Sequence, residues 1–258
     1  MTPILEASNL TKRFDSNGRS VTAVHNVSFA LAAGETLALV GPSGSGKSTL
    51  ARLVTRILEP DAGAIMLQEE DFLKLSGTPL RRRRRLLQMV FQDSSAAFNP
   101  RTTIKRALET PLRIHNLRPP NGRHDRVMEL LQQVGLDPSL STRSIHEISG
   151  GQRQRVAIAR ALACEPDVIV LDEALSGVDA SRRIELVRLL QSLQRSTGVA
   201  YLFISHDLPL VRAVSHRVAI IDCGEIVECG RASDIIENPQ SPTARALIAA
   251  APRLEPFR

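Results

Sequence analysis

The chain has 258 residues, of which 43% are hydrophobic and 23% are charged. These values are typical of a globular protein with one sizeable domain, or one domain with a subdomain, and the length is short for two independent domains. No stretch reaches the roughly 18–20 consecutive apolar residues of a membrane span. Residues 1–6 have neither a basic start nor an apolar core, so we expect a cytosolic chain without a signal peptide.

The net charge of +6 and the three cysteines bear on which partners and ligands the chain could bind. Much of the charge comes from the run Arg81–Arg85, which we interpret as a solvated helix face, or as a contact with a membrane or a partner subunit. With 3% aromatic residues and no Trp, base-stacking platforms for nucleic acid are not expected. The cysteines are odd in number and form no CxxC pair, which indicates reduced thiols and no metal-ligand cluster.

The first third of the sequence alternates short β-rich runs with turns. We predict strands at Leu5–Leu10, at Val24–Leu31 and at Thr36–Val40, the last of them bounded by glycines on both sides. A helix is expected over Lys47–Leu58, and a further short strand at Ile65–Leu67.

Residues from about 93 to 165 are polar, helical in period and interrupted by prolines, and we predict that they form a helical subdomain inserted into an α/β core. The β pattern returns at Val168–Leu171, Ala200–Ile204 and Val218–Ile221. The first two are apolar runs separated by a helical segment from about 181 to 195, which is typical of buried parallel strands joined by a crossover helix. A short helix over 244–251 is expected in a proline-rich tail.

A glycine-rich loop follows the predicted strand Thr36–Val40 and opens the predicted helix. It reads Gly41-Pro42-Ser43-Gly44-Ser45-Gly46-Lys47-Ser48, a complete G-x-x-x-x-G-K-S. Backbone N–H groups of such a loop point at phosphates, the lysine reaches the β- and γ-phosphates, and the serine hydroxyl is a Mg²⁺ ligand. Because strand and helix stand on either side, we interpret the loop as a nucleoside triphosphate site and not as a chance glycine-rich turn.

Polar residues follow three other predicted strands. Asp172-Glu173 comes directly after Val168–Leu171. Ionised carboxylates at the end of a buried strand lower the stability of the fold unless they have partners. The carboxyl ends of strands in an open parallel sheet are where ligands bind. Asp172 suits a hydrated Mg²⁺, and Glu173 suits a base that orients or deprotonates water. His206 follows Ala200–Ile204, and Gln92 follows a strand at 88–91; alone each is weak, but together these four side chains face the phosphate loop.

A second glycine motif, Ser149-Gly150-Gly151-Gln152, precedes a predicted helix over 153–163. Exposed N–H donors and a hydroxyl at a helix N-terminus suit an anion. The motif lies about 100 residues after the phosphate loop, and the residues of one chain give no reason why the two should meet.

The stretch from Ile148 to Leu162, ISGGQRQRVAIARAL, closely resembles the signature motif of ABC ATPases. Other motifs of that family follow in the expected order. They are an adenine-stacking aromatic at Phe14, the Walker A loop at Gly41–Ser48, the Q-loop glutamine at Gln92, the Walker B strand at Val168–Glu173, the D-loop at Ser176–Asp179 and the switch histidine at His206. The resemblance covers nearly the whole chain.

The resemblance implies an α/β P-loop NTPase of RecA-like core with an antiparallel β subdomain and the helical signature subdomain, over residues 1–237, and a short tail over 238–258. It implies that two ATPase chains pair head to tail, so that the signature of one closes over the γ-phosphate held by Lys47 of the other. Glu173, His206 and Gln92 would be catalytic, and Ser48, Gln92 and Asp172 would hold Mg²⁺. ATP would be bound by Phe14, Gly41, Pro42, Ser43, Gly44, Ser45, Gly46, Lys47, Ser48 and Thr49, and by the signature residues Ser149, Gly150, Gly151 and Gln152.

Some residues depart from the family pattern. The signature opens with Ile148 in place of Leu, the D-loop reads Ser-Gly-Val-Asp in place of Ser-Ala-Leu-Asp, and Phe14 replaces the commoner Tyr. None of these changes removes a catalytic position, so we expect a competent site.

The branch of the family is indicated by the residues after Gln92. The run FQDSSAAFNPR at 91–101 resembles the peptide/nickel importer branch, and the tail NPQSPTARAL at 238–247 is similar to its C-terminal element. Asp172-Glu173-Ala174-Leu175-Ser176 resembles the D-E-A-V-S of the nickel importer's second ATPase, which favours nickel or a metal–metallophore complex, with di- or oligopeptides close behind.

The same resemblance implies the partners and the location. We expect a second ATPase subunit, in a heterodimer or a homodimer, together with two membrane permeases and an extracytoplasmic solute-binding protein, and no nucleic acid. The chain would lie peripherally on the cytoplasmic face of the inner membrane. The first alternative is an importer for another solute. A non-transport ABC ATPase acting on DNA would need long heptad arms, and one acting in translation would need two ATPase halves, which this sequence does not have. The presence of Glu173 and His206 argues against a regulatory subunit that binds ATP without turnover.

Overall fold

The computed structural model describes residues 2–16, 19–91, 98–99, 101–175 and 180–250. Its strands are β1 (Leu5–Ser16), β2 (Arg19–Leu31), β3 (Thr36–Val40), β4 (Ala62–Leu67), β5 (Glu70–Asp71), β6 (Leu87–Val90), β7 (Val168–Asp172), β8 (Ala200–Ile204), β9 (Arg217–Asp222) and β10 (Glu225–Arg231). Its helices are α1 (Lys47–Val54), α2 (Gly77–Arg84), α3 (Ile104–His115), α4 (Arg123–Gln133), α5 (Gly150–Leu162), α6 (Ala180–Thr197), α7 (Leu208–Val214), α8 (Ala232–Glu237) and α9 (Pro242–Ala250). Within these residues, no helix combines the length and the apolar character needed to cross a membrane.

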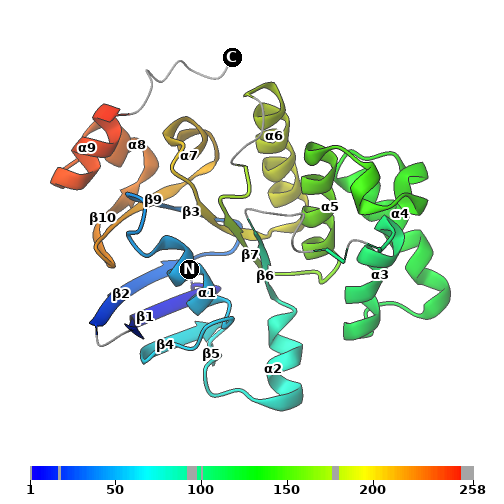
Figure 1. Ribbon diagram of the computed structural model, residues 1–258, viewed down its shortest axis with the longest axis horizontal. Coiled ribbons are helices and arrows are strands. Elements are labelled where there is room, and N and C mark those ends of the chain that lie inside the picture. Colours follow the sequence, from blue (N-terminus) through cyan, green and yellow to red (C-terminus); the bar gives the residue numbers. More distant parts are fainter. Residues whose placement is uncertain (1, 17–18, 92–97, 100, 176–179, 251–258) are drawn as a thin grey trace.

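The central element is a six-stranded sheet of order β10-β9-β3-β8-β7-β6 (Figure 1). Neighbouring strands from β9 to β6 run parallel, and β10 pairs antiparallel with β9. β3, β7 and β8 are buried along their whole length. Side chains alternate between the two faces of a strand, and in β3 Leu37 and Leu39 pack on one face while Ala38 and Val40 pack on the other. Both faces therefore carry a hydrophobic core, which explains the continuous apolar runs.

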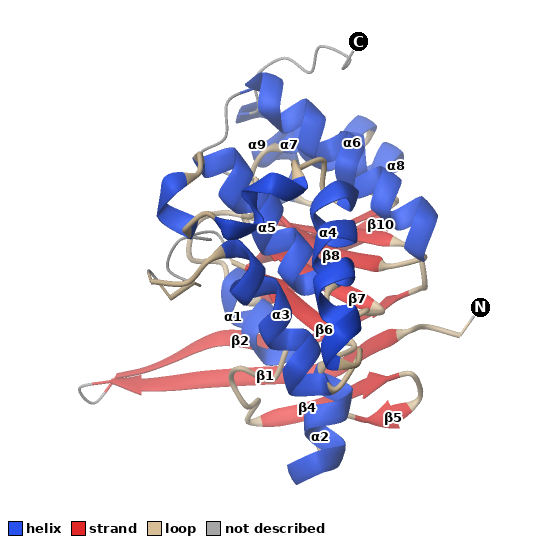
Figure 2. Cartoon of the chain, turned by 90° about the vertical axis from the view of Figure 1, so that its right-hand side faces the viewer, coloured by secondary structure: helices blue, strands red, loops and turns tan. Residues whose placement is uncertain are grey.

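One face of this sheet packs against α1 and a four-stranded antiparallel sheet of order β2-β1-β4-β5. Buried residues of β1, β2 and β4 share one core with Leu50 and Leu53 of α1 and with Leu37 and Leu39 of β3. Figure 2 shows this smaller sheet beneath the helices.

The other face is covered by helices. Figure 1 shows α3, α4 and α5 gathered at one side of the sheet and α8 and α9 at the other. One continuous core joins residues of α3, α4 and α5 to residues of α6, α7 and the sheet. Thr103 begins α3 as an N-cap, its hydroxyl accepting from the N–H of Arg106, which satisfies a backbone donor that a helix start leaves open.

Two predicted elements have different bounds in the structure. One is the hairpin of β1 and β2, which is longer than predicted, and the other is α1, which is shorter. The hairpin of β1 and β2 reaches Ser16 and Arg19, well beyond the predicted Leu10 and Val24, because its outer part pairs through the backbone with exposed side chains and irregular register. The predicted helix to Leu58 was wrong at its end. α1 stops at Val54, because Arg56 is left-handed with φ 53° and its guanidinium donates to two loop carbonyls.

Candidate active site

The glycine-rich loop lies between β3 and α1, where the sequence predicted it. Gly46 has φ 103°, and a Cβ there would lie 2.2 Å from the carbonyl oxygen of Ala23. A Cβ at Gly41 would lie 2.1 Å from the carbonyl oxygen of Ile221. Both positions therefore require glycine, one for its backbone conformation and both for close approach to neighbouring backbone. The loop is clamped between β2 and β9.

Lys47 is the first residue of α1 and is 7% exposed. Its Nζ donates to the carbonyl oxygens of Gly41 and Pro42, at 2.8 and 2.7 Å, so the ammonium points back along the loop. Burial lowers the pKa of Lys47, while the nearby carboxylates of Glu173 and Asp172 act against that shift. A buried cation at the start of a helix, held by the carbonyls of a glycine-rich loop, is suited to a bound phosphate.

Ser48 and Asp172 meet at the edge of the sheet. Ser48 Oγ donates to Asp172 Oδ1 at 3.0 Å, although the two residues are 124 positions apart in the sequence. Asp172 is the last residue of β7 and is buried. Burial raises the pKa of its carboxyl, and the negative charge of Glu173 raises it too, against the hydrogen bond from Ser48 and the cations Arg52 and Lys47.

The same pair of residues fits a magnesium ion. A hydroxyl oxygen and a carboxylate oxygen are the hard ligands that Mg²⁺ takes in phosphate sites, where phosphates and waters complete the octahedron. Asp172 is buried with a raised carboxyl pKa, and a divalent cation would compensate the charge that burial disfavours. The site therefore suits a cation that arrives with a phosphate ligand.

Glu173 and His206 lie opposite each other at the ends of β7 and β8. Nδ1 of His206 is 3.4 Å from Oε1 of Glu173. Glu173 is left-handed with φ 48°, and its N–H donates to the carbonyl of Ile204, which turns the chain sharply away from the strand. A non-glycine residue in this conformation stores strain, and such strain gathers at functional sites. The turn presents the carboxylate at the edge where the phosphate loop lies.

The signature motif forms the N-terminus of α5. Ser149 Oγ accepts from the N–H of Gln152, and the Gln152 side chain accepts from the N–H of Ser149, a reciprocal capping box. Ser149 and Gly150 are exposed. A Cβ at Gly150 would meet no atom within 4 Å, and one at Gly151 would meet only the Arg182 side chain at 3.7 Å. Packing within the chain therefore does not explain why these positions are glycine.

Phe14 lies on β1, opposite Val21 of β2, and its side chain is 42% exposed. Lys12 Nζ lies 5.9 Å from the ring centre. An exposed aromatic ring on a strand offers a stacking surface for a base.

The structure brings together some of the predicted site residues and leaves others apart. Lys47, Ser48, Asp172, Glu173 and His206 converge at the carboxyl edge of the central sheet. In the described part of the chain, no hydrogen bond or ion pair joins the signature residues 149–152 to the loop 41–49. Gln92 and the D-loop residues 176–179 lie outside the described residues.

Sequence reasoning missed the neighbouring residues that hold the phosphate loop and the turn at His206 in place. The turn after β9 holds the phosphate loop, because the N–H of Gly224 donates to the carbonyl of Ser45 at 3.0 Å. Beside His206, Asp207 caps α7 and pairs with Arg183. The Asp222-Cys223-Gly224 turn signal was visible in the sequence, but nothing local connects it with a loop almost 180 residues earlier.

Comparison with known proteins agrees with this geometry. Residues 24–176 match the family described as ABC transporter. The chain is 48% identical over 263 aligned residues to the glutathione import ATP-binding protein GsiA of Escherichia coli (strain K12), and 47% identical to GsiA of Salmonella paratyphi A; 99% of the chain is covered in both alignments. The chain spans 42% of the length of these relatives.

Solved structures show the same architecture. The ATP-binding cassette MJ0796, a dimer in a post-hydrolysis state bound to ADP and Pi, superposes with a TM-score of 0.79 at 27% identity, over 88% of this chain and 98% of that one. The cbiO1 protein of Clostridium perfringens, part of the ABC transporter complex cbiONQ, gives a TM-score of 0.80 at 26% identity, over 92% of this chain and 91% of that one. The fold is that of a P-loop NTPase, and the chain belongs to the ABC transporter family.

Proposed function

We propose that the chain hydrolyses ATP and thereby drives an importer in a membrane. The observation that carries this proposal is the convergence of Ser48 with Asp172, and of Glu173 with His206, at the sheet edge beside the glycine-rich loop. The match to an import ATP-binding protein over 99% of the chain supports the transport role.

Each side chain has a definite task in this proposal. The backbone N–H groups of residues 43–48 and the Lys47 ammonium bind the phosphates and neutralise charge that develops on the γ-phosphoryl group. Glu173 holds the attacking water and accepts its proton. His206, whose Nδ1 lies 3.4 Å from Oε1 of Glu173, donates to the γ-phosphate. Gln92 is assigned to the same site from the sequence alone.

Mg²⁺, when bound, supplies charge neutralisation at the β- and γ-phosphates. Ser48 Oγ and the Asp172 carboxylate are the residues that would hold it, since they already lie 3.0 Å apart. Gln92 is a further ligand in this proposal. Phe14 would stack on the adenine through its exposed ring.

We propose that the site is completed by a second ATPase subunit. Gly150 and Gly151 are exposed or half-exposed at the start of α5 and are not required by packing within the chain. Glycine at a helix start lowers helix stability relative to Ala. Its use here is explained if a phosphate held by another copy or by a paralogous subunit approaches the backbone closely. The relative MJ0796 was solved as a dimer.

For the cargo, we propose a small peptide such as glutathione, itself a tripeptide, because the curated relatives at 47–48% identity are glutathione import proteins. Nickel or a metal–metallophore complex is the second candidate, favoured by the D-E-A-L-S run at 172–176. Two permeases and an extracytoplasmic binding protein would complete the importer, with this chain on the cytoplasmic face of the inner membrane.

The test is ATP hydrolysis by the wild type and by Glu173→Gln, with size-exclusion chromatography in ATP and Mg²⁺. We expect turnover in the variant to fall at least about 100-fold, because the base is lost, while the variant accumulates as a nucleotide-bound dimer. Glu69→Gln is the matched control, since Glu69 is exposed and lies outside the site. Equal turnover in Glu173→Gln and wild type would show that Glu173 is not the base. If the wild type is inactive alone, the same comparison is made on the complex co-purified with its permeases.

A further inference from the structure

A tight turn joins β9 to β10 beside the phosphate loop. Asp222 and Glu225 pair at the ends of the two strands, so the turn itself consists of Cys223 and Gly224. Both residues have a positive φ, 47° and 83°. Two consecutive left-handed residues form the compact turn of a β-hairpin, a conformation that glycine and asparagine adopt readily and cysteine does not. Contacts from outside the turn must therefore offset the strain at Cys223.

Gly224 connects this turn to the phosphate loop on one side and to β2 on the other. Its N–H donates to the carbonyl of Ser45 at 3.0 Å, and its own carbonyl accepts from the N–H of His25 at 2.8 Å. A Cβ on Gly224 would lie 3.0 Å from the carbonyl oxygen of Ala23, so the two backbones are in direct contact. The position of the turn therefore fixes the backbone of the loop at Ser45.

The C-terminal helix α9 holds the residue that begins the turn. Thr243 Oγ1 donates to Asp222 Oδ2 at 2.7 Å. This hydrogen bond lowers the pKa of the Asp222 carboxyl, and a hydrogen bond to a carboxylate is stronger than one between neutral groups. α9 is itself anchored, because Ala244 is buried and Leu247 and Ile248 pack against the helical core. Thr243 thus ties a packed helix to the turn.

A second carboxylate of the same hairpin fixes the segment that leads into α9. Glu228 of β10 accepts from the N–H groups of Gln240 and Ser241, at 2.9 and 2.7 Å. Ser241 Oγ in turn accepts from the N–H of Ala244 at 3.1 Å, at the start of the helix. The start of α9 is therefore held in a defined place on the hairpin, and the contact between Thr243 and Asp222 carries that placement to the turn.

We propose that Thr243 and Asp222 are positioning residues for the phosphate loop. α9 holds the turn of Cys223 and Gly224, and the turn holds the loop in the conformation that binds nucleotide phosphates. The inference rests on the proposed function of the loop as a nucleotide site. A loop that adopts its binding conformation for only part of the time binds its ligand more weakly by that fraction. The element that follows the ATPase core thereby sets the affinity of the site for nucleotide.

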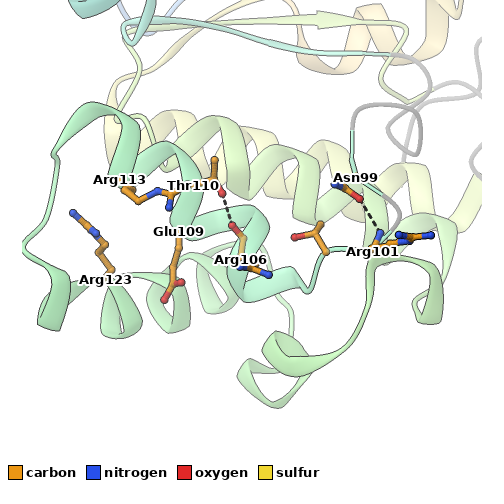
Figure 3. A pocket seen from close by; sticks show the side chains of 8 residues that line it. Asn99, Arg101, Arg106, Glu109, Thr110, Arg113 and Arg123 are labelled. Carbon is orange, nitrogen blue, oxygen red and sulfur yellow. Dashed lines mark hydrogen bonds between the residues drawn. The ribbon is translucent and has the colours of Figure 1, made fainter.

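The test is isothermal titration of the full chain with ADP. Thr243→Val keeps the shape of the side chain without the donor, and we expect it to bind ADP about fivefold more weakly, the order of effect that one hydrogen bond transmits. Thr243→Ser keeps the hydroxyl and should bind ADP as the wild type does. The matched control is Thr110→Val on α3 (Figure 3), since Thr110 is also half-buried and its hydroxyl also donates at 2.7 Å, to the carbonyl of Arg106. This control should bind ADP with wild-type affinity.

A second substitution tests whether the effect passes through the turn. Asparagine adopts the left-handed conformation more readily than cysteine, so Cys223→Asn should stabilise the turn independently of α9. In Cys223→Asn/Thr243→Val we therefore expect most of the lost ADP affinity to return. Such a recovery would not follow if Thr243→Val acted only by loosening α9.

Hydrogen exchange without nucleotide separates this inference from the proposed function. The N–H of Gly224 is protected by the carbonyl of Ser45, so the peptide that contains Gly224 should exchange faster in Thr243→Val than in the wild type or in Thr110→Val. A wild type that binds no ADP would overturn the proposed function, whereas the exchange would still report whether α9 positions the loop.

Three results would overturn the positioning role. One is equal exchange and equal ADP affinity in Thr243→Val and the wild type. Another is an equal loss of affinity in Thr243→Ser, which would show that the hydroxyl is not what acts. The third is a loss in Thr243→Val that Cys223→Asn does not restore, which would show that the effect does not pass through the turn.

Discussion

At the scale of single residues, Asp172 shows a conflict between stability and function. Its carboxyl is buried, and burial raises its pKa. The folded state therefore binds the proton more tightly than the unfolded state, and ionisation at neutral pH lowers the free energy of unfolding. The chain keeps a carboxylate where an uncharged side chain would be more stable.

We predict that Asp172→Asn raises the midpoint of thermal unfolding by about 2–4 °C at neutral pH without nucleotide, because Asn still accepts from Ser48 Oγ and carries no charge. Magnesium-dependent ATP hydrolysis should be lost. The difference in midpoint should shrink as the pH falls through the raised pKa toward 3.8, the ordinary value, since wild-type Asp172 is then protonated. A midpoint of the variant below that of wild type at neutral pH, with the difference lost at low pH, would show that the charge stabilises the fold.

At the scale of elements, two glycines at helix starts have opposite roles. Gly46 precedes α1 with φ 103° and touches the backbone of Ala23, whereas a Cβ at Gly150 meets nothing. The first glycine is required by the fold of one chain. The second is explained by what approaches the chain from outside.

We predict that Gly46→Ala lowers the free energy of unfolding by about 2 kcal/mol or more, from backbone strain and collision. Gly150→Ala should leave it unchanged or raise it by about 0.5 kcal/mol, because Ala restricts the unfolded chain. The same Gly150→Ala variant should hydrolyse ATP about 10-fold more slowly, since close positioning is lost. Urea unfolding and steady-state hydrolysis measure both. Loss of stability in Gly150→Ala, with unchanged turnover, would contradict our reading of the motif.

The buried strands were predictable almost to the residue. β3 and β8 match the predicted ranges and β7 is one residue longer, because both faces of each strand are covered and most of their side chains are apolar until the site begins. β10 was missed. It is an edge strand whose residues alternate between exposed and half-exposed. Its sequence includes charged residues and has no continuous apolar run that would predict a strand. The helical nature of the Arg81–Arg85 run is confirmed up to Arg84.

The residues that converge at the site could be named from the sequence, but the backbone contacts that position them could not. Motif and strand-end reasoning named Lys47, Ser48, Asp172, Glu173 and His206, which converge. The left-handed backbone of Glu173 and the contact of Gly224 with the loop arise from tertiary packing, to which no local pattern corresponds. The division of the chain at residue 237, the subdomain at 93–165 and the catalytic and binding roles of all the site residues, Gln92 and Phe14 included, stay predictions.

At the scale of the whole molecule, the separation of the signature from the phosphate loop gives a test of pairing. In the symmetric pair that we propose, each site would take its loop from one copy and its signature from the other. Lys47→Ala and Gly150→Asp should each be inactive alone, for different reasons. In an equal mixture, half of the dimers would be mixed, and each of these would hold one intact site.

We therefore expect the mixture of Lys47→Ala and Gly150→Asp to recover about one quarter of wild-type turnover if the sites act independently and copies exchange freely. The measurement is steady-state hydrolysis after co-incubation, with each variant alone as the control. No recovery, in a chain whose wild type hydrolyses ATP alone and whose copies exchange, would exclude two independent composite sites between copies of this chain.

The arrangement of the central sheet also tells an experimenter where the chain can be tethered. The residues named for chemistry lie at the carboxyl ends of β3, β7 and β8, whereas Gly198 lies just before β8, at the amino edge of the same sheet. Gly198 itself has φ 73°, which favours glycine, so a label belongs on an exposed residue beside it, such as Arg195 near the end of α6. A fluorophore attached there would lie toward the amino edge of the sheet, away from the phosphate loop, and would report on the motion of the subunit without entering its reaction centre.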